Sequence, residues 1–228
     1  MCGRFVLYSS KERIADRFSV DPSSLNLITH WEARYNIAPS TRCLIVRSSD
    51  LGWREMVTVS WGLLPHWAKS AADRRYINAR GETIFEKPAF RTVARHKRCL
   101  VVADGYYEWK AVGGRKIPYF FTMTDEHPFA MAGMWDCWER ERDRIESFAI
   151  ITTKANELSA TIHDRMPAII KPEAYDLWLD AESADPARLA PLIAPYSAES
   201  MHCWTVSTKV GDPKNETPEL IKPVKYSN

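Results

Sequence analysis

The sequence lacks the long apolar runs that a membrane protein needs. No stretch approaches the roughly 18 consecutive apolar residues of a membrane span, and the first residues lack the apolar middle of a secretory leader. Linkers rich in proline, glycine or serine, low-complexity tracts and repeats of fixed period are also missing, and the 14 prolines are scattered. We therefore expect a single domain over residues 1–228, in a protein of the cytoplasm.

The sequence has few cysteines, and they do not occur in closely spaced pairs. The five cysteines are Cys2, Cys43, Cys99, Cys137 and Cys203. Their odd number, and the absence of any C-x-x-C, argue against a disulfide framework. His202 precedes Cys203 in an alternating, strand-like stretch, which favours a core position over a metal site. We therefore assign no metal and no cofactor.

The sequence also lacks a large excess of one sign of charge, since the formal net charge is only +2. The basic residues are nevertheless uneven, because five Lys/Arg and no acid occur between Lys87 and Ala103. Such a run is either the solvated face of a helix or a track for a phosphate backbone. The sequence alone leaves both interpretations open.

Cys2 stands out because removal of Met1 would make it the N-terminal residue. Its α-amino group, with an ordinary pKa of about 7.7 to 8.0, and its thiol, with one of about 8.5, would both be partly reactive near neutral pH. Such a 1,2-aminothiol takes up an aldehyde in two steps, in which the amine forms an imine and the thiol closes onto the imine carbon to give a thiazolidine. The alternative is that Cys2 is only a small residue in a fraying terminus.

Hydrophobic patterning predicts an α+β protein. A helix with a serine cap is predicted within 9–20, and further helices within 87–96, 172–180 and 185–195. Strands are predicted within 41–48, 56–64, 99–104, 106–112, 117–123, 128–135, 147–153 and 201–208, and residues 168–170 are strand-like. Gly113-Gly114 is predicted as a hairpin turn, and the tail from Gly211 as irregular. Seven or eight strands without βαβ alternation favour a curved, mainly antiparallel sheet or barrel-like core flanked by helices.

Three polar stretches interrupt this pattern. Residues 77–83 place an asparagine, an arginine and a glutamate close together in a loop, which suggests a polar site. Glu108 lies among three aromatics, either facing solvent on an edge strand or desolvated and holding a proton near neutral pH. The triplet from His163 to Arg165 is either a turn with local ion pairing or part of a site.

Six motifs occur in a fixed order between residue 2 and about Lys209: MCGRF, YNIAPS, WGLLPHW, INARGET, ADGYYEWK and IHDRMP. In this set the chain resembles the SRAP family, the SOS response-associated peptidases, also described as abasic-site processing proteins. The resemblance implies the SRAP fold in a monomer that binds single-stranded DNA and associates with the nucleoid. It also implies covalent capture of abasic sites as a thiazolidine at Cys2, after Met1 is lost by self-cleavage or to a methionine aminopeptidase.

The resemblance also implies roles for single residues. By motif, Cys2 is the nucleophile, Asn78 contacts the abasic sugar, and Glu108 and His163 carry protons for ring opening and Schiff-base chemistry. The residues implied to contact DNA are Arg4 and Arg80 at the backbone, Pro39 and Trp67 against the bases, Thr152 at a phosphate, and Arg165. Ala68 stands where relatives can carry a second tryptophan, and an arginine sometimes found after INAR falls near Lys87 here; these departures concern stacking and DNA affinity.

The residue types suit this chemistry without the family name. An abasic sugar is mostly a closed hemiacetal, so its ring must open before an amine attacks, and this needs a proton carrier such as Glu108 or His163. An amide such as Asn78 holds hydroxyls without competing for protons. The imine also permits β-elimination of the 3′ phosphate, so weak lyase activity is an expected side reaction.

Two other classes of function remain open. Class II glutamine amidotransferases also begin with Met-Cys-Gly and use the same α-amine as a base, so an N-terminal nucleophile hydrolase is one alternative. The INAR and IHDRMP loops have no task in that scheme. A non-catalytic module for single-stranded DNA is the other, and it predicts reversible binding that does not depend on an abasic site.

Overall fold

The computed structural model describes residues 2–226, apart from the side chain of Leu27. The strands are β1 (Phe5–Leu7), β2 (Arg34–Ile37), β3 (Arg42–Ser48), β4 (Arg54–Trp61), β5 (Asn78–Arg80), β6 (Arg98–Ala103), β7 (Gly105–Val112), β8 (Arg115–Met123), β9 (Phe129–Arg140), β10 (Asp143–Lys154), β11 (Arg165–Pro167), β12 (Ile169–Ile170) and β13 (Met201–Thr205). The α-helices are α1 (Lys11–Phe18), α2 (Val93–His96), α3 (Glu157–Ala160), α4 (Tyr175–Leu179) and α5 (Pro186–Leu189). The 3₁₀ helices are η1 (Pro22–Leu27), η2 (Gly81–Thr83), η3 (Pro172–Ala174), η4 (Ala190–Ile193), η5 (Ala198–Ser200), η6 (Thr208–Gly211) and η7 (Pro218–Ile221).

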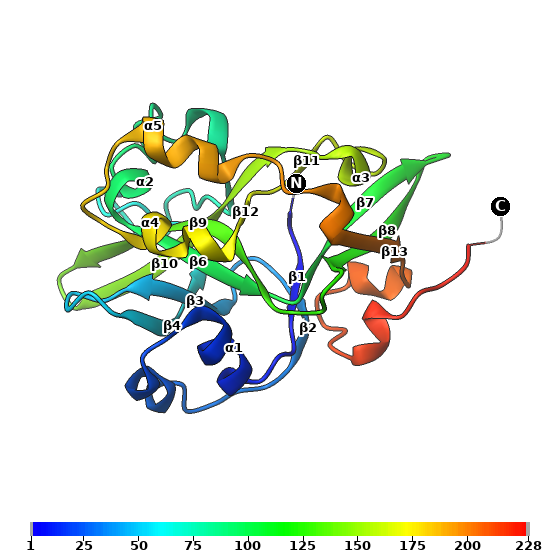
Figure 1. The fold of residues 1–228 in the computed structure, drawn as a ribbon, viewed down its shortest axis with the longest axis horizontal. Helices are drawn as coiled ribbons and strands as arrows, with labels where there is room; N and C mark the ends of the chain where they lie inside the picture. Colours follow the sequence, from blue (N-terminus) through cyan, green and yellow to red (C-terminus); the bar gives the residue numbers. More distant parts are fainter. Residues whose placement is uncertain (1, 227–228) are drawn as a thin grey trace.

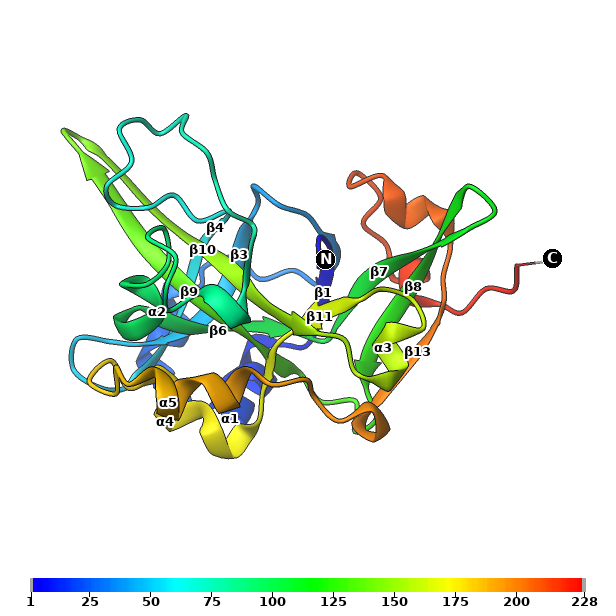
Figure 2. The same ribbon diagram turned by 90° about the horizontal axis from the view of Figure 1, so that it is seen from above.

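Five strands close into a barrel. β10 pairs with β4, β4 with β3, β3 with β6 and β6 with β9, and β9 returns to β10, so the ring is complete. All these pairs are antiparallel except β4 with β10, which is parallel. The barrel lies on one side of the molecule, with α2, α4 and α5 against it (Figures 1 and 2). β6 is buried along its whole length, as its uninterrupted apolar run predicts.

A second, antiparallel sheet runs in the order β13-β8-β7-β1-β2. β1 lies inside it, because Phe5 is opposite Tyr106 of β7 and opposite Ile37 of β2. The buried carboxylate of Asp104, which joins β6 to β7, accepts hydrogen bonds from the backbone N–H groups of Tyr8 and Ser9 at 2.6 and 2.7 Å. The connection from the barrel therefore fixes the end of β1.

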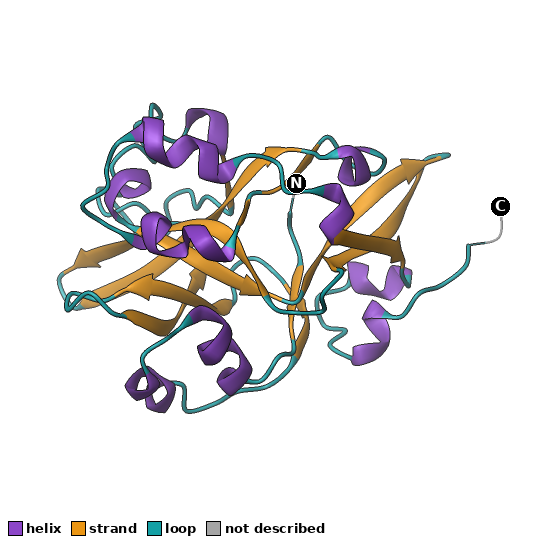
Figure 3. Ribbon diagram, viewed as in Figure 1, coloured by secondary structure: helices purple, strands orange, loops and turns teal. Residues whose placement is uncertain are grey.

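The two sheets share an aromatic core. Phe5 of β1 meets Trp61 of β4 edge to face, with ring centroids 5.2 Å apart, and Trp61 stacks on Phe148 of β10 at 6.3 Å. All three side chains are buried. β1 is thus packed against the barrel at the same place where it pairs with β7, and its N-terminal end lies between the two sheets (Figures 2 and 3).

The expected α+β fold with a barrel-like core is confirmed. Ser10 caps α1 by accepting from the N–H of Arg13, as the sequence indicates. Gly113 and Gly114 form the predicted hairpin turn, with φ values of 55° and 77° that favour glycine in this turn type.

Three expectations need correction. The described residues form thirteen strands rather than seven or eight, since several strands of two to four residues are too short to show a periodic pattern. The helix predicted within 87–96 is α-helical only from Val93, and turns precede it around Pro88, whose ring disfavours helical geometry at the preceding residue. The tail beyond Gly211 contains η7, and Leu220 of this helix is buried.

Candidate active site

Cys2 lies just before β1 and is buried. Its Sγ lies 3.9 Å from the carbonyl oxygen of Arg4 and donates a weak hydrogen bond to it. Burial raises the pKa of the Cys2 thiol well above its ordinary value, and the negative charge of Glu108 raises it further. The thiol is therefore held in its neutral form in this environment, so it is not a ready nucleophile at neutral pH.

Asn78 reaches the backbone of Cys2. Its Nδ2 donates to the carbonyl oxygen of Cys2 at 2.7 Å, although the two residues are 76 positions apart in the chain. β5 places Asn78 there by pairing in parallel with β10, where Asn78 is opposite Ile150. Its buried Oδ1 accepts no hydrogen bond from any residue within 2–226, which leaves this amide oxygen available to a donor such as a hydroxyl.

Glu108 belongs to β7, and its side chain is buried, with the residue 4% exposed. β7 is an inner strand between β1 and β8, so the solvent-facing position considered for this carboxylate does not occur. Its charge acts on both Cys2 and Tyr106. The structure therefore brings the buried Cys2 and Glu108 together with the half-buried Asn78 in one polar cluster.

His163 follows α3 in a turn. Its backbone N–H donates to the carbonyl oxygen of Ser159 at 2.9 Å, and the Ser159 hydroxyl lies 3.3 Å from the Tyr106 hydroxyl of β7. Its Nδ1 accepts from the backbone N–H of Arg165 at 3.0 Å and lies 2.9 Å from Asp164 Oδ1. Nδ1 pairs with Asp164 only when the imidazole is protonated, and Ser159 ties the same turn to β7.

Arg4, an expected DNA contact, binds the C-terminal segment. Its NH1 donates to Asn36 Oδ1 and to the carbonyl oxygen of Val210, both at 2.8 Å, and its NH2 donates to Gly211 at 3.3 Å. Burial lowers the pKa of Arg4, while the charges of Asp212 and Glu216 oppose this effect. Arg4 therefore fixes the chain next to Cys2, and no local sequence pattern records this attachment, because its partners are distant in the chain.

Asn36, from the YNIAPS motif, completes this attachment. Its Nδ2 donates to the carbonyl oxygens of Val210, Asp212 and Asn215, and its backbone N–H donates to Glu216 Oε1. These contacts hold the segment 210–216 against β2. Sequence reasoning missed Asn36, although its place inside a recognised motif was a signal.

Arg165 and Thr152, two further expected DNA contacts, bond to each other. The Arg165 guanidinium donates to Thr152 Oγ1 and, at 2.6 Å, to the Thr152 carbonyl oxygen. It also forms a bidentate pair with Glu82, at 2.9 Å for each contact. Thr152 is buried. Glu82 belongs to the polar loop 77–83, and the sequence alone indicates no role for it.

The remaining expected contacts are more exposed. Trp67 is 52% exposed on the loop after β4, and Arg80 is exposed at the end of β5. No residue in the described part of the chain accepts a hydrogen bond from the Arg80 guanidinium, which leaves its donors available. Pro39 is half-buried in the turn after β2, where the backbone N–H of Ser40 donates to the carbonyl oxygen of Trp61 at 2.8 Å. Ala68 is buried beside Trp138, whose Nε1 donates to the Ala68 carbonyl oxygen at 2.9 Å.

The basic run from Lys87 to Ala103 is largely structural. Arg98 is buried and donates to the carbonyl oxygens of Trp178, Ala94 and Ser183, and burial lowers its pKa to about 10. Arg95 donates to the Phe85 carbonyl oxygen, and Lys97 pairs with Asp136. Neither a solvated helix face nor a continuous phosphate track describes this run.

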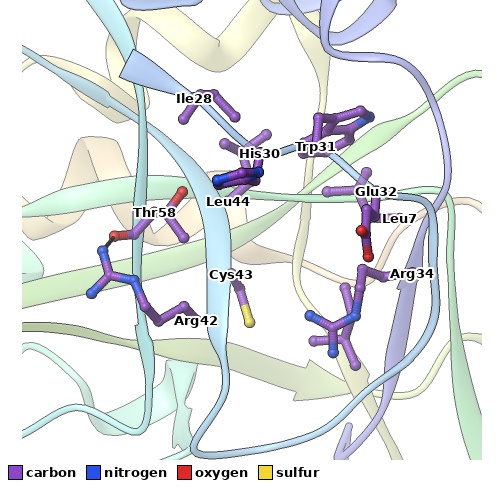
Figure 4. Close-up of a pocket in the computed structure, with 11 residues that line it drawn as sticks. Leu7, Ile28, His30, Trp31, Glu32, Arg34, Arg42, Cys43, Leu44 and Thr58 are labelled. Carbon is purple, nitrogen blue, oxygen red and sulfur yellow. Dashed lines mark hydrogen bonds between the residues drawn. The ribbon is translucent and has the colours of Figure 1, made fainter. Parts of the chain in front are cut away.

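Away from these residues, a pocket of about 310 Å³ lies where the segment before β2 meets β3 and β4. Figure 4 shows the Cys43 thiol between the side chains of Arg34 and Arg42. Both arginines have partners, since Arg34 pairs with Glu216 at 3.2 Å and Arg42 donates to the Thr58 carbonyl oxygen. None of the expected site residues lines this pocket.

Neither a metal site nor a membrane-spanning helix emerges from the part of the chain that the structure describes. Within residues 2–226, no group of three His, Cys, Asp or Glu side chains is placed to hold a metal ion. No helix of this part is long and apolar enough to cross a membrane.

Comparison with known proteins gives a match over nearly the whole chain. The model of the SOS response associated peptidase (SRAP) family matches residues 1–213. The abasic site processing protein YoqW of Bacillus subtilis is 40% identical over 228 residues, covering 97% of this chain and 99% of that protein. The abasic site processing protein YedK of Escherichia coli is 32% identical and covers 98% and 100%. A crystal structure of a Bacteroides thetaiotaomicron protein, 32% identical, superposes with a TM-score of 0.88 over 98% of this chain and 100% of the other.

Proposed function

This chain belongs to the SOS response associated peptidase (SRAP) family, and from that premise we propose that it captures abasic sites in single-stranded DNA covalently through Cys2. The names of relatives that match over their whole length support abasic-site processing. The observation that carries the proposal is the polar cluster in which Asn78 donates to the Cys2 carbonyl oxygen and the Glu108 charge acts on the buried Cys2 thiol. An aminothiol, an amide and a carboxylate are the groups that thiazolidine formation needs.

The reaction begins when Met1 is removed, by self-cleavage or by a methionine aminopeptidase. The α-amine of Cys2 then attacks the aldehyde carbon of the ring-opened sugar, and the carbinolamine loses one water to give an imine. The thiol adds across the imine, so that a carbon–sulfur bond forms and the thiol proton ends on nitrogen. Because burial keeps the Cys2 thiol neutral, this last step needs a nearby proton acceptor, and Glu108 is suited to it.

Of the other site residues, Asn78 binds the sugar and His163 transfers protons. Asn78 holds a sugar hydroxyl through its buried Oδ1, and His163 carries protons during ring opening and water loss. Peptidase activity is confined to Met1 in this scheme, and β-elimination from the imine gives weak lyase activity. We propose that the protein acts as a monomer, without metal or cofactor, in the cytoplasm at the nucleoid.

DNA binding uses a stacking face and cations. Trp67 offers an exposed ring to bases, Pro39 offers a further apolar contact, and Arg80 offers phosphate contacts. Arg4 and Arg165 contact the DNA backbone through the N–H donors that their internal hydrogen bonds leave, and the buried Thr152 orients Arg165. Sequence-tolerant stacking and backbone contacts suit a protein that responds to a lesion rather than to a sequence.

Incubation with a single-stranded oligonucleotide containing one abasic site tests this function. Protein whose mass confirms loss of Met1 should form an adduct that survives heating in detergent, whereas Cys2→Ala should form none. The same oligonucleotide without the lesion should bind reversibly and give no adduct. Reversible binding alone would favour the non-catalytic module, and release of glutamate from glutamine would favour the amidotransferase alternative.

A further inference from the structure

Glu82 and Arg165 form a cross-link between two segments that carry site residues. Glu82 lies in η2, four residues after Asn78, and Arg165 begins β11, two residues after His163. Their bidentate pair has both N···O distances at 2.9 Å, and the Arg165 side chain is only 11% exposed. Charge-assisted bidentate pairs are among the strongest and most directional hydrogen bonds in proteins.

The pair closes across the end of β10. Thr152 of β10 is opposite Arg80 of β5 on one side and opposite Pro167 of β11 on the other. Arg165 also donates to the carbonyl oxygen of Thr152, at 2.6 Å, so the guanidinium bonds to the middle strand as well. The three strand ends are thereby fixed to one another through a single side chain.

Close packing at Gly81 shows how tightly η2 is held against β10. A Cβ atom at Gly81 would lie 2.9 Å from Ile193 Cδ1 and 3.3 Å from the Thr152 carbonyl oxygen. A side chain at this position would therefore require Ile193 or η2 itself to shift.

The number of free N–H donors on Arg165 limits how it can bind a phosphate. A guanidinium has five N–H donors. Within residues 2–226, Nε donates to Thr152 Oγ1, NH2 donates to Glu82 and to the Thr152 carbonyl oxygen, and NH1 donates to Glu82. One N–H of NH1 remains, so Arg165 cannot hold a phosphate through two hydrogen bonds while Glu82 is in place.

We propose that Glu82 is a positioning residue which, through Arg165, holds Asn78 and His163 in register across β10. This inference rests on the proposed function, because Asn78 and His163 act together only in that reaction. Loss of the pair lets η2 and the His163 turn move independently. A displacement of about 1 Å at a reacting centre can cost on the order of a hundredfold in rate.

The test compares Glu82→Gln with Glu86→Gln. Glutamine keeps the size of the side chain but turns an N–H₂ group toward the guanidinium, so at least one of the two bonds is lost. Glu86 is an exposed carboxylate on the same segment, and no hydrogen bond or ion pair joins its side chain to another described residue, so Glu86→Gln is the matched control. Thermal melting confirms that each variant is folded.

The first readout separates binding from chemistry. At saturating abasic DNA, Glu82→Gln should crosslink roughly tenfold to a hundredfold more slowly than the parent. Its affinity for the intact oligonucleotide should stay within about twofold, and Glu86→Gln should match the parent in both. Crosslinking of Glu82→Gln at the parent rate would overturn the proposal. So would tighter binding of intact DNA with a salt slope larger by roughly 0.7, because Glu82 would then merely shield Arg165 from phosphate.

The second readout does not depend on activity. Amide hydrogen exchange should become faster in Glu82→Gln at the N–H of His163 and the N–H of Arg165, which donate to Ser159 and to His163 Nδ1 in the parent. If the parent itself formed no adduct, the proposed function would fail, and exchange would still decide whether the pair orders these segments. Unchanged exchange at both amides would refute the positioning role in either case.

Discussion

Asp136 anchors the loop that presents Trp67, and its loss should destabilise the protein measurably. The carboxylate is 1% exposed. Oδ2 accepts from the backbone N–H of His66 at 2.7 Å and lies 2.8 Å from His66 Nδ1, while Oδ1 accepts from Lys97 Nζ at 2.9 Å. Burial opposes the charged form, but the hydrogen bonds from Lys97 and His66 outweigh it and lower the pKa of Asp136.

The magnitude follows from what Asp136→Ala leaves behind. Breaking a buried ion pair by removing one partner costs about 3 to 5 kcal/mol. The side chains of Lys97 and His66 are 39% and 52% exposed, so water replaces part of their bonding. We therefore expect the free energy of unfolding to fall by about 2 to 3 kcal/mol at neutral pH.

The same contacts predict a pH dependence. A lowered folded-state pKa contributes stability above the unfolded value, about 3.9 for aspartate, and this contribution disappears as the pH falls through the folded value. The difference in unfolding free energy between the parent and Asp136→Ala should therefore shrink below about pH 4. Urea unfolding at a series of pH values measures it.

Asp176→Ala is the control for this prediction. Asp176 also pairs with an arginine, Arg54, at 2.6 Å, but its side chain is 94% exposed. An exposed pair contributes below about 1 kcal/mol, so this variant should stay close to the parent. The reasoning is refuted if Asp136→Ala unfolds with the parent's free energy at neutral pH, or if Asp176→Ala loses as much.

Three further predictions concern alkaline stability, proton transfer and DNA binding. Burial raises the pKa of Cys43 to about 12. The stability that the neutral Cys43 thiol contributes is therefore present below the unfolded pKa of about 8.5 and is lost as the pH rises toward 12. Near pH 10 the loss is about 2 kcal/mol, and urea unfolding of Cys43→Ala should lack this part of the alkaline decline. Glu108→Gln and His163→Ala should bind intact DNA like the parent but crosslink about a hundredfold more slowly in single-turnover measurements across pH, and parent rates in both would make these residues structural. Arg80→Ala should reduce the slope of log affinity against log salt by about 0.7, whereas Arg142→Ala, in the β9–β10 turn far from Cys2, should leave it unchanged.

Local sequence signals account for the longer elements of this fold. The Ser10 cap and the Gly113-Gly114 turn act within a few residues, so their structures follow from the sequence nearby. β5, β11 and β12 have two or three residues each and form by pairing with distant strands, which no local pattern records. The barrel likewise closes through β4 and β10, whose parallel pairing joins segments far apart in the chain.

The candidate site could likewise be predicted only in part from the sequence. The motifs identified Cys2, Asn78 and Glu108, and the structure adds that the first two are joined by a hydrogen bond and that the third is buried beside them. The partners of Arg4 and Arg165 could not be foreseen, because each bonds to residues distant in sequence: Arg4 to Val210 and Arg165 to Glu82. A motif states which residue types occur together, whereas their bonding depends on the folded chain.

Treatment of the abasic DNA adduct with borohydride tests the thiazolidine claim most directly. A thiazolidine has no C=N bond, so the adduct of the processed parent should form without reductant and should keep its mass after treatment. Cys2→Ser retains the amine but lacks the thiol, so its adduct should survive heating only when borohydride reduces the imine, with a gain of two hydrogen atoms by mass spectrometry. If the parent adduct also required reduction, or if Cys2→Ser formed an equally durable adduct without it, capture would stop at the imine and the central claim would be wrong.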